Sequence, residues 1–134
     1  MNTKRWVITS IVVFVVHEVL AYLVHGVLLS GVYQATASLW RSMEEMNSMM
    51  WILWVGDLVW VFLLVYIFTK GYEAKGWMEG LRFGLLFGVF FSLPMALGSY
   101  AMMPMPFSLA VYWFVFGVIE ISILGIVTSL IYKK

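Results

Sequence analysis

The sequence predicts an all-α membrane protein: a polytopic four-transmembrane-helix bundle that forms a single domain over residues 1–134. The chain is 63% hydrophobic and only 11% charged, with a mean hydropathy of +0.97, whereas about a quarter of the residues in soluble domains are charged. Four apolar runs are each long enough to cross a hydrocarbon core of about 30 Å. In one of them glycine recurs every four residues, as Gly76, Gly80, Gly84 and Gly88.

The first span is predicted at about residues 6–29, after a basic start. A cleaved signal peptide also begins with basic residues and an apolar run, and residues 35–37 have the small-x-small form of a processing site. We expect the span to be retained instead, because the run is too long for a signal peptide and is interrupted by His17 and Glu18.

Residues 30–48 are the one polar segment of any length. Bulky apolar residues recur in it at three- and four-residue spacing, and the charged residues fall on the opposite side of the helix that this spacing describes. We therefore expect a short helix in the membrane interface, in the first outer loop. Its apolar face would be Leu39, Trp40, Met43, Met46 and Met50, and its polar face Arg41, Glu44 and Glu45.

The other three spans are predicted at about residues 49–69, 76–98 and 107–131. Residues four apart lie on one side of a helix, so the glycines of the third span form a stripe without side chains. Such a stripe lets a neighbouring helix, or a second copy of the chain, approach closely. Pro94 near the end of this span removes one helical hydrogen bond, and we expect it to kink or loosen the last turn.

The basic residues of the termini and loops predict the orientation of the chain in the membrane. In a four-span topology all but one of them fall on the same side as both termini, and by the positive-inside rule this side is cytoplasmic. It carries Lys4, Arg5, Lys70, Lys75, Lys133 and Lys134, whereas Arg41 lies on the other side.

Three spans each carry one carboxylate near the midplane of the membrane. At a rise of about 1.5 Å per residue, Glu18, Asp57 and Glu120 lie about 16 to 20 Å from the cytoplasmic edge, with His17 beside them. An unpaired charge at this depth costs at least about 2.5 to 3.5 kcal/mol, so each acid should face the bundle interior and find a partner or hold a proton. Three interpretations follow: a structural polar network, a site for a proton or another cation, and a metal or haem site.

Arg82 is a further charge within a span, three residues after Glu79. We expect its long side chain to bend toward the cytoplasm and pair with Glu79. The alternative is that Arg82 reaches Glu18 or Glu120 and neutralises part of the acid layer.

His17 and His25 both lie on the first span, so haem ligation has to be considered. On an α-helix they are about 80° apart around the axis and about 12 Å apart along it, so they cannot bind one ion between them. The chain has no third histidine. Bis-histidine haem within one monomer is therefore excluded, whereas ligation by His25 and an outer methionine stays open.

The methionines suggest copper as an alternative metal. Thioethers suit Cu(I), Met43, Met46 and Met49 have helical spacing, and His25 approaches the same outer face. A methionine stripe is also typical of adaptable packing at an interface. We therefore expect no cofactor, with haem and copper as the alternatives.

The chain lacks the usual signatures of enzymes and of nucleic-acid binding. It has no Gly-x-Ser-x-Gly, no phosphate-binding loop and no His-Glu-x-x-His, and without cysteine it has no thiol nucleophile or disulfide. A net charge of +1 gives no positive field for nucleic acid. We expect a protein that is not an enzyme and whose surroundings are the lipid bilayer.

Three runs of the sequence carry a family resemblance. They are Phe68-Thr69-Lys70-Gly71-Tyr72, Gly76-Trp77-Met78-Glu79-Gly80-Leu81-Arg82-Phe83-Gly84 and Pro94-Met95-Ala96-Leu97-Gly98, of which the Glu-Gly-x-Arg-x-Gly segment is the most specific. With them most of the chain resembles a group of small four-span bacterial inner-membrane proteins of no known activity. The resemblance implies a multi-pass protein of the bacterial inner membrane, and it implies no functional residue.

From these observations we expect a small accessory or assembly subunit of a membrane complex, as a homo-oligomer or within a larger assembly. The dense aromatic exterior and the lack of a soluble part favour this expectation. The first alternative is proton- or cation-coupled transport or binding through the midplane carboxylates. The second is a haem- or copper-binding membrane protein.

Overall fold

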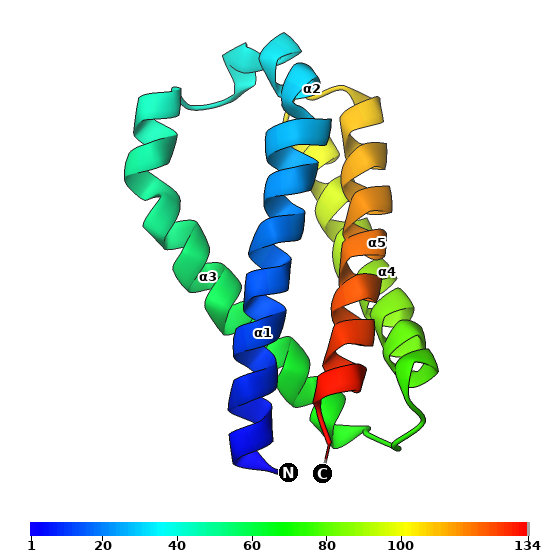
Figure 1. Ribbon diagram of the computed structural model, residues 1–134. Helices are drawn as coiled ribbons and strands as arrows, with labels where there is room; N and C mark the ends of the chain where they lie inside the picture. The colour runs from blue at the N-terminus through cyan, green and yellow to red at the C-terminus, as the bar shows by residue number, and fades with distance from the viewer. Residues whose placement is uncertain (134) are drawn as a thin grey trace.

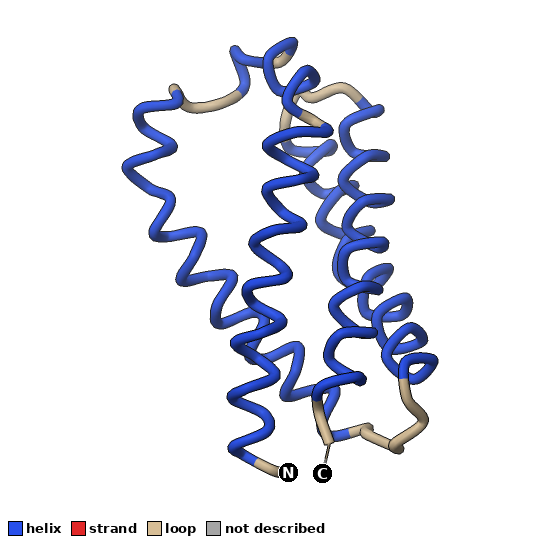
Figure 2. The backbone as a smooth tube through the Cα atoms, in the orientation of Figure 1, coloured by secondary structure: helices blue, strands red, loops and turns tan. Residues whose placement is uncertain are grey.

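The computed structural model describes residues 1–133, and the chain is helical over most of this length (Figure 1, Figure 2). Lys134, which the pattern of basic residues places on the cytoplasmic side, lies outside the described residues. In chain order the elements are α1 (Thr3–Ala21), the π-helix η1 (Tyr22–Leu28), α2 (Ser30–Ala35), the 3-10 helix η2 (Ala37–Leu39), α3 (Met43–Lys70), α4 (Trp77–Met102) and α5 (Phe107–Ile131).

Four helices are long and apolar enough to cross a membrane: α1 continued by η1, α3, α4 and α5. This finding confirms the predicted all-α chain with four candidate spans. The bounds differ most at two ends: α3 begins at Met43 rather than near residue 49, and α4 ends at Met102 rather than near residue 98. α4 continues through Pro94, so the proline removes one hydrogen-bond donor without ending the helix.

The polar segment at residues 30–48 does not form one continuous helix. It contains α2 and η2, of six and three residues, and then the start of α3. The side chain of Ser42 accepts a hydrogen bond from the backbone N–H of Glu45 at 3.2 Å, and Glu44 and Glu45 place negative charge at the positive end of the helix. This capped start makes residues 43–48 the first turns of α3, which the apolar spacing alone did not indicate.

α4 and α5 form the most extensive helix pair of the described chain, and small residues make the contact. A methyl group on Gly84 would lie 2.5 Å from the Cα of Ser122, and one on Gly88 would lie 3.0 Å from the Cα of Val118. At Gly80 the backbone of α5 is closer still. Without side chains at these positions the two backbones touch, and close dispersion contacts then hold the pair together in lipid.

The small residues that make this contact differ in part from the four glycines predicted from the sequence, Gly76, Gly80, Gly84 and Gly88. Gly125 of α5 faces Gly80 and Gly84, so both helices contribute glycine. Gly76 lies outside the contact, because it is the N-cap of α4 with a φ of 73° and has no atom within 4 Å of its Cβ position. Its left-handed conformation, which glycine adopts without steric cost, serves the turn before α4.

α1 lies against α5 and α3, and α3 joins the other helices mainly through its second half. Trp6 donates its Nε1–H to the carbonyl of Phe62 at 3.2 Å, and Val13 is buried with Val61 in one apolar cluster. The first half of α3 leans away from the other helices (Figure 1). There, residues 51–55 are each 50 to 61% exposed, and five successive residues cover the whole circumference of a helix. This stretch is therefore largely unpacked on every side.

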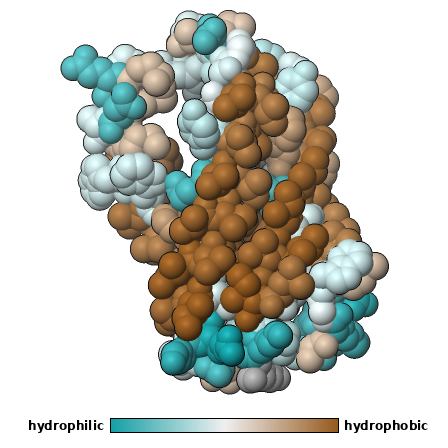
Figure 3. Space-filling view, viewed as in Figure 1, coloured by the Kyte–Doolittle hydropathy of each residue, from teal (hydrophilic) through white to brown (hydrophobic). Residues whose placement is uncertain are grey.

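Both ends of the described chain lie at the same end of the helices. The backbone N–H of Asn2 donates to the hydroxyl of Tyr132 at 3.2 Å, and the loop between α3 and α4 lies at this end too (Figure 1). Figure 3 shows hydrophilic residues gathered there, below a broad hydrophobic band. Polar ends on either side of an apolar middle are what a membrane-spanning structure requires.

The turn between α3 and α4 is held by Glu79, a buried residue at the start of α4. Its carboxylate accepts hydrogen bonds from the backbone N–H groups of Glu73 at 2.6 Å and Lys75 at 2.8 Å. Arg82, the partner expected from the sequence, is exposed and forms no ion pair within residues 1–133. Glu79 instead stabilises a turn in which Ala74 has a positive φ of 62°.

Replacing Gly84 tests the packing of α4 on α5. Gly84→Leu should lower the free energy of unfolding by about 3 kcal/mol or more, because the new side chain meets backbone that cannot move aside. The measurement is unfolding in mixed micelles followed by circular dichroism. Gly98→Ala on the same helix is the control: it has open space at its Cβ position and should be neutral or stabilising by about 0.5 to 1 kcal/mol. Equal effects of the two variants would contradict the close contact.

Replacing Glu79 tests the turn. Glu79→Ala leaves two backbone N–H groups without their acceptor and should lower the free energy of unfolding by about 2 to 3 kcal/mol. Arg82→Ala removes an exposed charge and should change it by no more than about 0.5 kcal/mol. If both variants lost the same stability in the unfolding assay, an ion pair between the two residues would be the better explanation.

Candidate functional site

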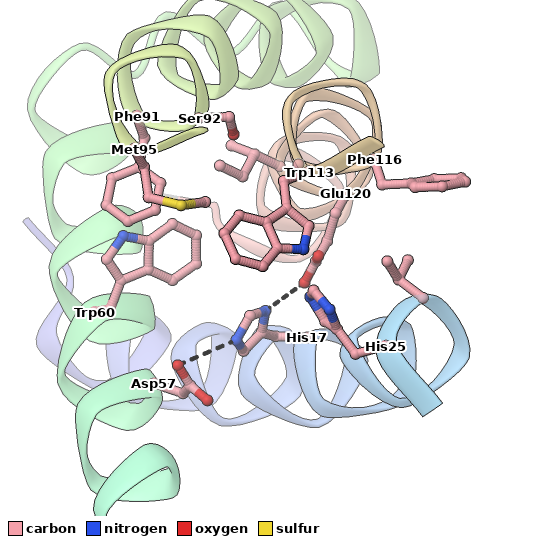
Figure 4. Close-up of a pocket in the computed structure, with 13 residues that line it drawn as sticks. His17, His25, Asp57, Trp60, Phe91, Ser92, Met95, Trp113, Phe116 and Glu120 are labelled. Atoms are coloured by element: carbon pink, nitrogen blue, oxygen red, sulfur yellow. Dashed lines mark hydrogen bonds and ion pairs between the residues drawn. The ribbon is translucent and has the colours of Figure 1, made fainter. Parts of the chain in front are cut away.

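His17 lies between two carboxylates that come from two other spans (Figure 4). Its Nδ1 is 2.6 Å from Oε1 of Glu120 on α5, and its Nε2 is 3.6 Å from Oδ1 of Asp57 on α3. The side chains of His17 and Glu120 are only 14% and 12% exposed. The ring is hydrogen-bonded to Glu120 and within ion-pair distance of Asp57. A position between two carboxylates suits the positively charged imidazolium form, in which both ring nitrogens carry a proton.

Glu18 brings a third carboxylate to the same place. One ligand atom from each of His17, Glu18 and Asp57 lies within 4.8 Å of the others. Oε1 of Glu18 is buried and has no hydrogen-bond partner among residues 1–133. The side chain borders the space between α1 and the first half of α3, which Trp51 and Trp54 line from the other side. We call His17, Glu18, Asp57 and Glu120 the His17 site.

A cavity of about 380 Å³ adjoins the His17 site, and all four candidate spans contribute to its lining. Its ionisable surface comes from His17, His25, Asp57 and Glu120, and aromatic rings from α3, α4 and α5 provide its walls. Among the described residues no lysine or arginine lines it. The cavity therefore combines carboxylates with apolar surface and contains no basic side chain other than histidine.

The contact between α4 and α5 sets the shape of this cavity. Ser92 of α4 packs on Gly117 of α5, where a methyl group would lie 3.0 Å from the Cβ of Ser92. Glu120 follows Gly117 by three residues, so the same contact fixes the depth at which its carboxylate enters the cavity. On the opposite wall the ring of Trp60 is 5.4 Å from that of His17 and 5.5 Å from that of Phe91.

The π-helix η1 brings His25 to the cavity that His17 also lines. An α-helix would leave the two histidines about 80° apart around the axis. In η1 the backbone hydrogen bonds join residues five apart, so each residue turns the chain less than in an α-helix. The smaller rotation reduces the angle between the two histidines, a departure that the sequence pattern did not indicate.

His25 takes part in a separate polar network, in which the hydroxyl of Tyr33 links η1, α2 and α5. Its Nδ1 is 2.6 Å from the hydroxyl of Tyr33, and Nε1–H of Trp113 donates to the same hydroxyl at 2.8 Å. Burial raises the pKa of the Tyr33 hydroxyl, so the group stays protonated at neutral pH. It can donate to His25 while it accepts from Trp113.

The other candidate ligands lie apart from the His17 site. Met43, Met46 and Met49 belong to the first turns of α3, which stand away from the end of α1 and η1 where His25 lies (Figure 1). The structure does not bring these methionines together with His25. Arg82 is exposed near the start of α4 and does not line the cavity.

Several residues of the cavity were not singled out from the sequence. Trp60 and Trp113 belong to this group, together with Phe91, Ser92 and Met95 of α4. The sequence could have indicated two of them, because Trp60 follows Asp57 by three residues and Trp113 precedes Glu120 by seven. These helical spacings place a tryptophan on the same side of its helix as the acid.

Comparison of the chain with protein-family models, with curated proteins and with solved structures gives no match. The chemistry of the His17 site and of the cavity therefore has to be derived from the geometry alone. One imidazole and three carboxylates, gathered in the apolar part of the chain, can bind and release protons, and they can bind a cation.

Proposed function

We propose that this protein is a small, non-enzymatic, multi-pass membrane protein that binds a cation at the His17 site in exchange for a proton. One observation carries the proposal: His17 contacts the carboxylates of Glu120 and Asp57 within the candidate spans, beside Glu18. Intramembrane ionisable groups of this kind are associated with ion and proton pathways.

The charge balance of the His17 site supports this proposal. Its three carboxylates carry up to three negative charges, whereas His17 supplies at most one positive charge. No lysine or arginine of the described chain lines the adjoining cavity. Excess negative charge in an apolar medium costs several kcal/mol per ion unless it is neutralised. Protons or a cation would neutralise the same carboxylates, so the two compete for one site.

The proposal includes the orientation and the location of the chain. Lys4 and Arg5 belong to the end that carries both termini, Lys70 is the last residue of α3 at this end, and Lys75 lies in the loop that follows. Arg41 lies in the connection at the opposite end. The positive-inside rule then makes both termini cytoplasmic. The family resemblance of the sequence favours the bacterial inner membrane.

Infrared spectroscopy of the purified protein tests proton binding at the His17 site. As the pH is lowered from neutral, the wild-type protein should gain the C=O stretching band of a protonated carboxyl group in an apolar environment. The combined variant Glu18→Gln, Asp57→Asn, Glu120→Gln should lose this band completely, because it retains no carboxyl group in the site. A wild-type spectrum without such a band at any pH would contradict the proposal.

The matched control removes three carboxylates that lie outside the His17 site. Glu44→Gln, Glu45→Gln and Glu73→Gln replace three exposed carboxylates, and this combination should keep the band. If the combined variant of the site does not fold while this control does, the carboxylates are needed for the structure. The infrared test is then made on Asp57→Asn alone, which leaves the 2.6 Å contact between His17 and Glu120 in place. This variant should show a weaker carboxyl band than the wild type.

A role as a subunit of a membrane assembly is the second candidate, favoured by the first half of α3. Residues 51–55 are exposed around the whole helix, and Figure 3 shows the surface hollowed between this part of α3 and the other helices. A second copy of the chain is the simplest partner for an unpacked stretch of spanning helix. Two copies that pack through α3 would bury the aromatic residues there.

Cysteine scanning tests the association through α3, because the chain has no cysteine of its own. Single cysteines at residues 51–55 should form disulfide-linked dimers at one or two of these positions, since a disulfide needs Cα atoms within about 7 Å. Leu86→Cys, which is highly exposed on α4, is the control and should give no more than background linkage. A monomeric native mass and no linkage above this control would argue against the dimer.

A further inference from the structure

The cavity beside the His17 site has two kinds of surface, one carrying carboxylates and one formed by aromatic rings. On one side lie the carboxylates of Asp57 and Glu120, joined through His17. On the other side lie the rings of Trp60, Trp113 and Phe91 (Figure 4). A ligand in this cavity would face carboxylate oxygens and aromatic rings at the same time.

The carboxylates decide the sign of the ligand's charge. Asp57 and Glu120 line the cavity, Glu18 lies next to them, and His17 is the one base in contact with these acids among residues 1–133. Of the described residues that line the cavity, only the two histidines are basic. An anion would be repelled here, and a neutral molecule would leave the excess negative charge without compensation. A cation fits the field of this cavity.

The aromatic walls and the volume decide the chemical class of the cation. Trp60 and Trp113 present rings rather than oxygen ligands, and a cation is attracted to the face of such a ring, most strongly to tryptophan. A volume of about 380 Å³ is far larger than a bare metal ion needs, and it lies within the range of about 300 to 1,000 Å³ that is typical of sites for small organic ligands. The unbranched side chain of Met95 in the same wall can adapt to apolar groups of different shape.

We propose that this cavity binds a small lipophilic organic cation, an aromatic or alkyl ammonium. Its charged group lies against Asp57 and Glu120, and its apolar part lies against Trp60, Trp113 and Met95. This inference rests on the proposed cation site and names its substrate class. Because the organic cation and protons neutralise the same carboxylates, binding of the one releases the other. The groups that take part in this exchange are His17, Glu18, Asp57 and Glu120, with His25 on the same cavity wall.

The first experiment measures binding of radiolabelled benzyltrimethylammonium to the purified full-length protein in detergent, by equilibrium dialysis. This probe is a quaternary ammonium, so it keeps its charge at every pH and has no ionisable proton. We expect saturable binding of about one molecule per chain that weakens as the pH is lowered. Neopentylbenzene, the uncharged carbon analogue of the same shape, should not displace the probe at saturating concentration. Non-saturable binding, or displacement by the uncharged analogue, would overturn the proposal.

Variants then locate the site. Trp60→Leu should weaken binding about 5- to 30-fold, the equivalent of a desolvated contact between a cation and a tryptophan ring. Trp77→Leu, at the start of α4 and away from the cavity lining, is the matched control and should bind as the wild type does. Asp57→Asn should weaken binding at least about tenfold. Unchanged affinity in Trp60→Leu would overturn the proposal even if Asp57→Asn failed to fold.

Two outcomes separate this inference from the function on which it rests. If the carboxyl band titrates as expected but benzyltrimethylammonium does not bind, the proton site stands and the organic cation is wrong. If Zn²⁺ alone binds stoichiometrically, and Glu18→Gln abolishes this binding, the site belongs to a metal held by His17, Glu18 and Asp57, and the organic cation is also wrong. If neither the proton titration nor any binding is seen, both proposals fail.

Discussion

The apolar interior of a membrane requires that ionisable groups placed there find partners within the protein. In this chain the imidazole of His17 is the partner of acids on two other helices, because one ring nitrogen contacts Glu120 and the other contacts Asp57. The contacts tie α1 to α5 and to α3 in the middle turns of these helices. Apolar packing in lipid is weakly directional, so polar contacts of this kind are what fix the depth of one helix against another.

α4 contributes no charge to the His17 site, yet it decides the shape of the cavity. The close approach at Gly84 and Gly88 holds α4 against α5, and the same contact continues to Ser92 and Gly117 beside the acid of α5. α3 meets α4 through aromatic side chains, such as Trp60 with Phe91. The close pair of α4 and α5 on one side and the second half of α3 on the other therefore form opposite walls of the cavity.

Much of the fold could be predicted, and part of the site. Hydropathy alone gives four long apolar helices, and the depth calculation places Glu18, Asp57 and Glu120 in one layer, which the structure brings together around His17. The partners of Glu79 could not be predicted in this way, because the carboxylate binds backbone N–H groups that only a folded turn presents. The position of His25 could not be predicted either, because a π-helix replaces the expected α-helix.

The sequence by itself determined that the chain is helical and apolar enough to cross a membrane four times, because composition and the spacing of apolar residues act locally along each helix. It also determined which residues bring charge into the spans. Only the tertiary structure decided that His17 is shared between two carboxylates and that rings from three helices surround an adjoining cavity. The reason is that rotation and tilt of each helix follow from contacts with its neighbours, and these contacts are made between residues far apart in the chain.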